Sequence, residues 1–163
     1  LHYTLSQQKL RVAGPARTVS ALESLTVTDF DLAREFEMGR DYQRLIELPA
    51  SVVSLDGVTN VTLSFDTSDM ASTTLNISNI RLINVPSNYD MEILSSLVSG
   101  VELYGPQEEI EELSADSVVA QIDCQSISLT VGQQTIPVTI QIPSSTRIFA
   151  TGSYTVQCEV TAK

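Results

Sequence analysis

The chain has 163 residues, enough for one ordinary domain or two small ones. Hydrophobic residues make up 42% and aromatic residues only 6%, and Val, Ile, Thr and Ser are abundant, which indicates a folded, strand-rich protein. The net charge of −11 repels phosphate groups, so nucleic-acid binding and docking on an anionic membrane surface are not expected.

The chain begins with a strand-like stretch, LHYTLSQQKLRV, that leads to Gly14-Pro15. Val19 and Leu22 follow at helical spacing, and Pro suits the first position of a helix because its missing N–H has no partner there anyway. The first residue is Leu1 and not Met, and the pattern begins part-way through a unit found again later. We therefore expect a piece of a longer protein.

An alternating segment then ends at Asp31, and a strand, LIELP, ends at Pro49. The turn signal SLDGVTN precedes a last strand that carries Val61, Leu63 and Phe65. Asp31, like Asp123 later in the chain, is predicted to act as a turn or backbone cap, since a catalytic carboxylate pair would need a partner that the pattern does not supply.

The same order of features recurs after residue 70. The stretch TTLNISNIRLINVPSNYDMEILSSLVSGVEL leads to a second Gly-Pro, and a short helix, an alternating strand and two further strands follow. The matched positions are Gly14-Pro15 with Gly105-Pro106, Val19 and Leu22 with Ile110 and Leu113, Asp31 with Asp123, Pro49 with Pro143, and Val61, Leu63 and Phe65 with Tyr154, Val156 and Cys158. The sequence thus predicts two repeats, 1–70 and 71–163, the first lacking its leading strand.

Three segments of the second repeat place apolar residues on one face at a period of two. They are Val118, Ala120, Ile122 and Cys124; Ile136, Val138, Ile140 and Ile142; and Tyr154, Val156, Cys158 and Val160. Each repeat is predicted to hold five or six short strands and one short helix. Antiparallel pairing is favoured because no segment is long enough for repeated crossover helices, so the fold class is mainly β with short helices, a β-rich α+β fold.

The most conspicuous charged feature is the acidic run Glu108, Glu109, Glu111 and Glu112. One interpretation is a calcium site or a site for a cationic partner. The other is a solvated helix start, where the helix dipole favours carboxylates. The first repeat has Ala16, Arg17, Thr18, Ser20 and Ala21 at the same place, so the unit does not need acid there, and we favour the second interpretation.

Cys124 and Cys158 both fall on apolar strand faces. They are interpreted as two small buried hydrophobic residues, and Leu32 and Phe65 at the matching places of the first repeat support this. A disulfide in an oxidising compartment stays open as the alternative, if the two strands are neighbours.

No catalytic, cofactor-binding or metal-ligating residue is predicted. His2 is the only histidine and sits near the start of the chain, and the sequence has no G-x-S-x-G, P-loop, G-x-G-x-x-G or Cys-x-x-Cys motif. Asn60 and Asn76 lie in N-x-T and N-x-S patterns, which are common by chance. Small-molecule substrates and cofactors are therefore not expected, and a carbohydrate or metal binder is disfavoured.

The ordered set SGVELYGPQEEIEELSADSVVAQID, followed by TIPVTIQIPSSTRIFATGSYTVQCEV, resembles a YbbR-like domain repeat. Residues 10–66 resemble the same pattern less closely. The resemblance implies tandem β-rich units on the outer side of a bacterial membrane, behind one N-terminal membrane helix. It also implies a non-enzymatic role as a regulator of the membrane-bound diadenylate cyclase, which makes cyclic di-AMP.

The expected partner is therefore the cyclase or another membrane or cell-wall protein. The alternative is a generic β-rich cell-surface structural or adhesion domain. The incomplete first repeat further predicts an open sheet edge. We expect the leading segment of the second repeat, or another molecule, to cover it, and an unpaired strand across residues 1–12 would contradict this.

Overall fold

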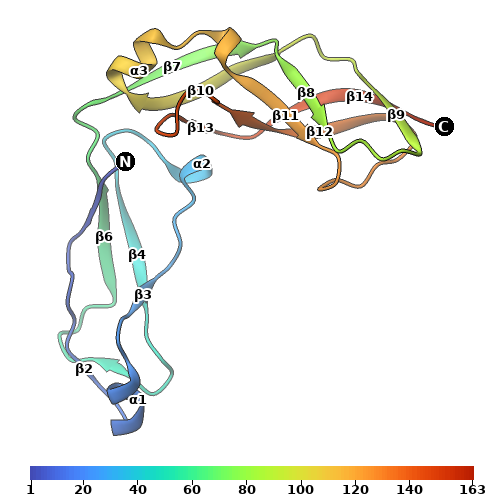
Figure 1. The fold of residues 1–163 in the computed structure, drawn as a ribbon. Coiled ribbons are helices and arrows are strands. Elements are labelled where there is room, and N and C mark those ends of the chain that lie inside the picture. The colour runs from blue at the N-terminus through green and yellow to red at the C-terminus, as the bar shows by residue number, and fades with distance from the viewer. The chain divides into compact units, whose positions relative to one another are not determined.

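A computed structural model describes all residues, 1–163. The chain divides into two compact units (Figure 1). The first unit consists of Leu1–Asp31 and Glu35–Ser68, and the second consists of Leu32–Arg34 and Asp69–Lys163. None of the helices is long and apolar enough to span a bilayer.

The second unit contains eight strands, a short helix and a single 3₁₀ turn. They are β7 (Met70–Ile77), β8 (Ile80–Ile83), β9 (Tyr89–Ile93), β10 (Val98–Pro106), α3 (Gln107–Glu112), η1 (Ala115–Ser117), β11 (Val119–Asp123), β12 (Gly132–Gln141), β13 (Phe149–Thr151) and β14 (Tyr154–Ala162). They form a three-stranded sheet, β13-β10-β7, and a five-stranded sheet, β8-β11-β12-β14-β9.

One sequence-based expectation for this unit is wrong, and the favoured antiparallel pairing holds with one exception. The strand number exceeds the five or six predicted, because the leading segment forms separate strands. Pairing is also not entirely antiparallel, since β8 runs parallel to β11. A parallel pair needs a long connection, and here β9, β10 and α3 supply it in place of one crossover helix.

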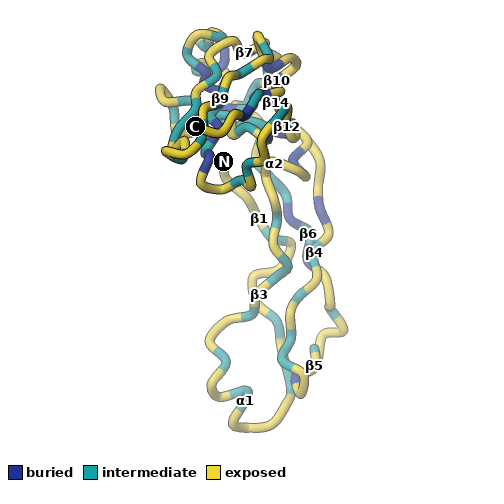
Figure 2. The backbone as a smooth tube through the Cα atoms, turned by 90° about the vertical axis from the view of Figure 1, so that its right-hand side faces the viewer, coloured by how far each residue is buried: buried dark blue, intermediate teal, exposed yellow.

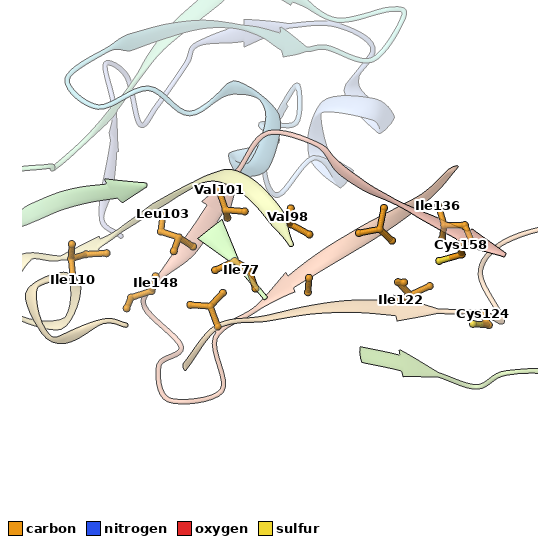
Figure 3. Close-up of a cluster of buried hydrophobic side chains, with 13 residues drawn as sticks. Ile77, Val98, Val101, Leu103, Ile110, Ile122, Cys124, Ile136, Ile148 and Cys158 are labelled. Carbon is orange, nitrogen blue, oxygen red and sulfur yellow. The ribbon is translucent and has the colours of Figure 1, made fainter. Parts of the chain in front are cut away.

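The core of the second unit draws on both sheets and on α3. Figure 3 shows Ile77 of β7 in the middle of this cluster, near Val101 and Leu103 of β10, and all three are fully buried. Ile110 is buried from α3 and Leu113 packs against the cluster, as their helical spacing predicted. The alternating faces predicted for β11 and β14 also supply buried residues: Val118, Ala120, Ile122, Cys124, Val156, Cys158 and Val160.

The first unit is built from shorter elements. They are β1 (Tyr3–Leu5), β2 (Val12–Ala13), α1 (Ala16–Ala21), β3 (Thr26–Val27), β4 (Asp41–Glu47), β5 (Val53–Ser54) and β6 (Asn60–Phe65), and α2 (Leu32–Glu35) lies at the division between the units. The strands form a four-stranded sheet, β1-β6-β4-β3, and the pair β2-β5. Figure 2 shows few buried positions along this part of the chain and none in α1.

The two helices that follow Gly-Pro have the same local geometry. Pro15 has φ −56° and ψ 136°, and Pro106 has φ −55° and ψ 136°. The sequence suggested that each proline is the first residue of its helix. In the structure each proline is instead the residue just before the helix. Both helices are six residues long, and each ends with a backbone N–H that donates 3.2 Å to a carbonyl three residues earlier, Leu22 to Val19 and Leu113 to Ile110.

The glycines of both Gly-Pro pairs are packing positions. A Cβ on Gly14 would lie 2.9 Å from the Ser51 carbonyl oxygen, and one on Gly105 would lie 2.8 Å from Cγ1 of Ile148. Val52 and Ile148, which cover these glycines, are both buried. A glycine is therefore required at both places, because the chain crosses a neighbouring segment at close range.

Strand pairing repeats between the units with the same partners. Strand β2 pairs with β5 as β10 pairs with β13, and β4 pairs with β6 as β12 pairs with β14. Strand β1 pairs with β6 at the place where β9 pairs with β14, with Tyr3 opposite Phe65 and Ile93 opposite Cys158. The doubled order read from the sequence is thus also a doubled pairing scheme.

One detail of the match between the repeats needs correction. Matching Asp31 to Asp123 would put Thr28 at the position of Ala120. The hydrogen-bond register instead places Thr26 opposite Glu47 and Val119 opposite Gln141, so Val27 corresponds to Ala120. The η1 turn lengthens the connection in the second unit, and this shifts the match by one residue.

The first unit lacks counterparts of two strands, β7 and β8, and not of one leading strand. Residues 1–12 are not an unpaired strand, because β1 pairs with β6. The segment Met70–Ile83 pairs with β10 and β11 of its own unit, so the expectation that it covers the first unit's edge is wrong. The predicted fold class, mainly β with short helices, is confirmed.

Candidate functional site

The first unit contains a hollow of about 520 Å³, which we call the strand groove. It is lined by apolar side chains from β2, α1, β3, β4 and β6, with the segment Leu5–Leu10 along one side. The apolar lining residues are Leu5, Leu10, Val12, Val19, Leu22, Leu25, Val27, Ile46 and Val61.

The matching positions of the second unit are covered. Leu103 matches Val12, Ile110 matches Val19 and Ala120 matches Val27, and these three are buried whereas their counterparts in the first unit are half-buried. What covers them is the segment Met70–Ile83, whose Ile77 is fully buried and whose Leu75, Ile80 and Leu82 pack against the core. The groove therefore lies where the first unit has no counterpart of β7 and β8.

The strand groove carries little charge. Its lining includes one cation, Lys9, and one anion, Glu23, and the remaining lining residues are uncharged. Beside it, β2 and β3 have no strand partner on their outer edges. An apolar hollow bordered by two open backbone edges suits an extended polypeptide, because a small molecule cannot pair with both edges along their length.

The acidic run on α3 is partly used inside the second unit. Glu109 accepts a hydrogen bond from the Ser145 hydroxyl and pairs with Arg147, and these interactions hold its pKa below the ordinary value. Glu111 accepts a hydrogen bond from Gln107 at 2.8 Å. These contacts hold the segment before β13 against α3, which is a structural role.

Asp31 and Asp123 lie in different settings. Oδ1 of Asp123 accepts hydrogen bonds from the Gln125 N–H and from Nδ2 of Asn84, both at 3.0 Å, so the predicted cap at the end of β11 is confirmed. Asp31 precedes α2, where its N–H donates to Oε1 of Glu35 and its carbonyl accepts from the Glu35 N–H. Both residues organise the backbone of their own surroundings.

Cys124 and Cys158 are free and buried. The strands β11 and β14 are not neighbours, because β12 lies between them. The Cys124 sulfur instead lies 3.4 Å from the Met91 sulfur. Burial raises the pKa of both thiols, as expected for small core residues.

An aromatic cluster in the first unit was not foreseen from the low aromatic content. The ring centroid of Phe30 lies 4.6 Å from that of Tyr42 and 5.0 Å from that of Phe65. The guanidinium of Arg44 lies 4.9 Å from the centroid of Phe30 and pairs with Glu35. The sequence signal was the charged stretch over residues 33–45, since two of its arginines, Arg40 and Arg44, lie over these rings.

The structure contains no group of three or more His, Cys, Asp or Glu side chains placed to hold a metal ion. His2 lies at an exposed position next to β1, where its carbonyl accepts a hydrogen bond from the Asp66 N–H. Oδ1 of Asn76 accepts from the Gly100 N–H at 3.0 Å.

Neither a scan against protein-family models nor a search of the curated proteins finds a match. A search of the solved structures finds the crystal structure of the YbbR-like domain of the lmo2119 protein from Listeria monocytogenes. The TM-score is 0.43 and the sequence identity 18%, over 57% of this chain and 95% of that chain.

Proposed function

We propose that this chain is a non-enzymatic protein-interaction module of a YbbR-type protein on the extracytoplasmic side of a bacterial membrane. Its role in this proposal is to regulate the membrane-bound diadenylate cyclase and hence the level of cyclic di-AMP. The repeats 1–70 and 71–163 would then be two units of a tandem array.

One observation carries the proposal. The order of features that resembles the YbbR pattern in sequence is also repeated in three dimensions, from Gly-Pro to the last strand. The glutamates of α3 have no counterparts in α1 of the first unit, whereas Gly14 and Gly105 are both closely covered by a neighbouring segment. A unit defined by its packing and not by a set of reactive side chains suits a module that presents surfaces to other proteins.

The test is an in-frame deletion of the 163 residues in the bacterium that encodes them, with cyclic di-AMP measured in extracts. The proposal expects a changed level that returns when the wild-type segment is restored at equal expression. An unchanged level would favour the alternative, a structural or adhesion domain of the cell surface.

Location is tested separately. A protease added to intact cells should degrade an extracytoplasmic module, while a cytoplasmic marker protein survives. Resistance in intact cells together with cleavage after lysis would contradict the proposed location.

A further inference from the structure

We propose that three sulfur atoms in the second unit bind one soft monovalent metal ion of the copper(I) class. They are Sδ of Met91, Sγ of Cys124 and Sγ of Cys158, which we call the sulfur cluster. The site lies inside one unit, and its binding of metal does not depend on the cyclase role proposed above.

Met91 and Cys124 are already in contact through their sulfur atoms. Met91 lies in β9, and Cys124 follows the last residue of β11. The two sulfur atoms are 3.4 Å apart. The Cys124 N–H donates a hydrogen bond to the Ile83 carbonyl oxygen at 3.0 Å, which fixes the backbone that carries this thiol. Two soft ligands that are 33 positions apart in the sequence therefore meet at one point, which no ligand spacing along the chain reveals.

Cys158 joins these two residues from the strand beside β9. Met91 lies opposite Val160 in the pairing of β9 with β14. Cys158 stands two residues from Val160, so its side chain points to the same face of the sheet, at a diagonal position that a long Met side chain can reach. Figure 3 shows both cysteines at the same end of the buried cluster. Burial and the neighbouring Cys124 raise the pKa of Cys158, which agrees with two thiols close together.

The kind of ligand selects the metal. Thiolate and thioether sulfur atoms are soft ligands, which favour copper(I) over the hard ions Mg²⁺ and Ca²⁺. Two cysteines alone would make an incomplete site, and the methionine adds a third ligand. A structural zinc site has four ligands, and this cluster supplies three.

The burial of the sulfur cluster agrees with an ion of single charge. Cys124 is 2% exposed and Cys158 is fully buried. A monovalent ion that replaces the proton of the Cys124 thiol leaves the net charge of the site unchanged, and the proton passes to solvent. A divalent ion would leave a positive charge among apolar side chains unless both thiols lost their protons.

Little movement is needed to hold the ion. Two bonds to sulfur of about 2.3 Å that meet at about 120° place the sulfur atoms about 4 Å apart. The sulfur atoms of Met91 and Cys124 must therefore separate by only about 0.6 Å. A Met side chain has three rotatable bonds and adapts readily to such a shift. Met91 is also the one partly exposed member of the cluster, so an entering ion meets its thioether first.

The first unit shows that the fold does not need sulfur at these places. Phe65 takes the place of Cys158, and Tyr3 takes the place of Ile93. Leu1, two residues before Tyr3, then matches Met91. The sulfur cluster is therefore an addition to the framework that the two units share.

The test is a competition for copper(I) with the intact, reduced chain under nitrogen. The coloured bicinchoninate complex of copper(I) is the donor, and the loss of its absorbance measures the ions that the protein withdraws. We expect one ion per chain. Met91→Leu keeps the side-chain volume nearly unchanged but should weaken binding at least about tenfold, since even outer-shell partners contribute that much to metal affinity.

A second methionine provides the matched control. Met70 is also half-buried in this unit but lies in β7, opposite Pro106. Met70→Leu should bind copper(I) as the unaltered chain does. Silver(I), which has the same charge and no redox chemistry here, should raise the urea midpoint of the second unit, because an ion bound by the native site stabilises the fold.

Three results would overturn the proposal. The first is that the native chain withdraws no copper(I). The second is binding that Met91→Leu leaves unchanged, or that Met70→Leu weakens equally. The third is a lower urea midpoint with silver(I), since the thiols would then bind the ion only after the unit unfolds.

Discussion

The matching helices α1 and α3 are buried to different extents. Matching mutations in them should therefore lower the free energy of unfolding by very different amounts. Ile110 of α3 is 7% exposed and packs in the core, whereas Val19 of α1 is half-buried and borders the strand groove. Truncating a buried Ile to Ala costs about 2–5 kcal/mol. Better helix propensity returns about 0.5 kcal/mol, so Ile110→Ala should destabilise its unit by roughly 3 kcal/mol.

Truncation to Ala at Val19 removes a side chain that is only half-buried. Losing two methyl groups that are about half covered costs roughly 0.8 kcal/mol, at about 0.8 kcal/mol per fully buried group. Ala recovers about 0.5 kcal/mol of helix propensity, so the net cost should be within about 0.5 kcal/mol of zero.

The assay is urea unfolding of the intact chain, followed by amide resonances that report each unit separately. The amide of Leu63 in β6 reports the first unit, and the amide of its counterpart Val156 in β14 reports the second, since both residues are buried. A cost above about 2 kcal/mol for Val19→Ala would show that the groove is closed in the free protein and would refute the reasoning.

Further predictions concern the acidic helix, the thiols and the Gly-Pro packing. The pKa of Glu109 is lowered in the fold, so the stability that Glu109 contributes is present above the ordinary glutamate pKa and is lost as the pH falls through the folded pKa. Glu109→Gln should therefore reduce the loss of the second unit's urea midpoint at acid pH, and Glu111→Gln is the control. A pH profile that Glu109→Gln leaves unchanged would contradict this. Cys124 and Cys158 should react with a thiol reagent only after unfolding, releasing two equivalents, and rapid labelling of the native chain or fewer thiols after denaturation would be inconsistent with free buried cysteines. Gly105→Ala should cost its unit about 1–3 kcal/mol because the new Cβ would lie 2.8 Å from the Ile148 side chain, and a neutral effect in thermal unfolding would show that this crossing is loose.

The fold class and the short helices after Gly-Pro could be predicted because they depend on local chemistry. Gly-Pro before a helical spacing of apolar residues determines the start of a short helix, and both copies have nearly the same proline dihedral angles. The alternating segments around Ala120 and Val156 bury the face that their period of two indicates.

An open edge in the first unit could be predicted, but the strand groove beside it could not, because it depends on pairing between distant segments. The sequence does not reveal that Ile80 lies beside Ala120 in a parallel pair, or that the first unit therefore lacks two strands. The one-residue shift that places Val27 at the position of Ala120 arises from the η1 turn, and spacing alone does not show it. Arg44 is similar, since its contact with Phe30 joins residues whose spacing carries no pattern.

Hydrogen exchange of the free intact chain tests most directly whether the first unit is the second unit's fold with two strands absent. Amides of β10 and β11 that face β7 and β8 should be protected close to the global limit of their unit. Those of β2 and β3 that face the open edges should exchange nearly as fast as loop amides, while amides between β4 and β6 stay protected. Equal protection of the outer edges in both units would contradict the account.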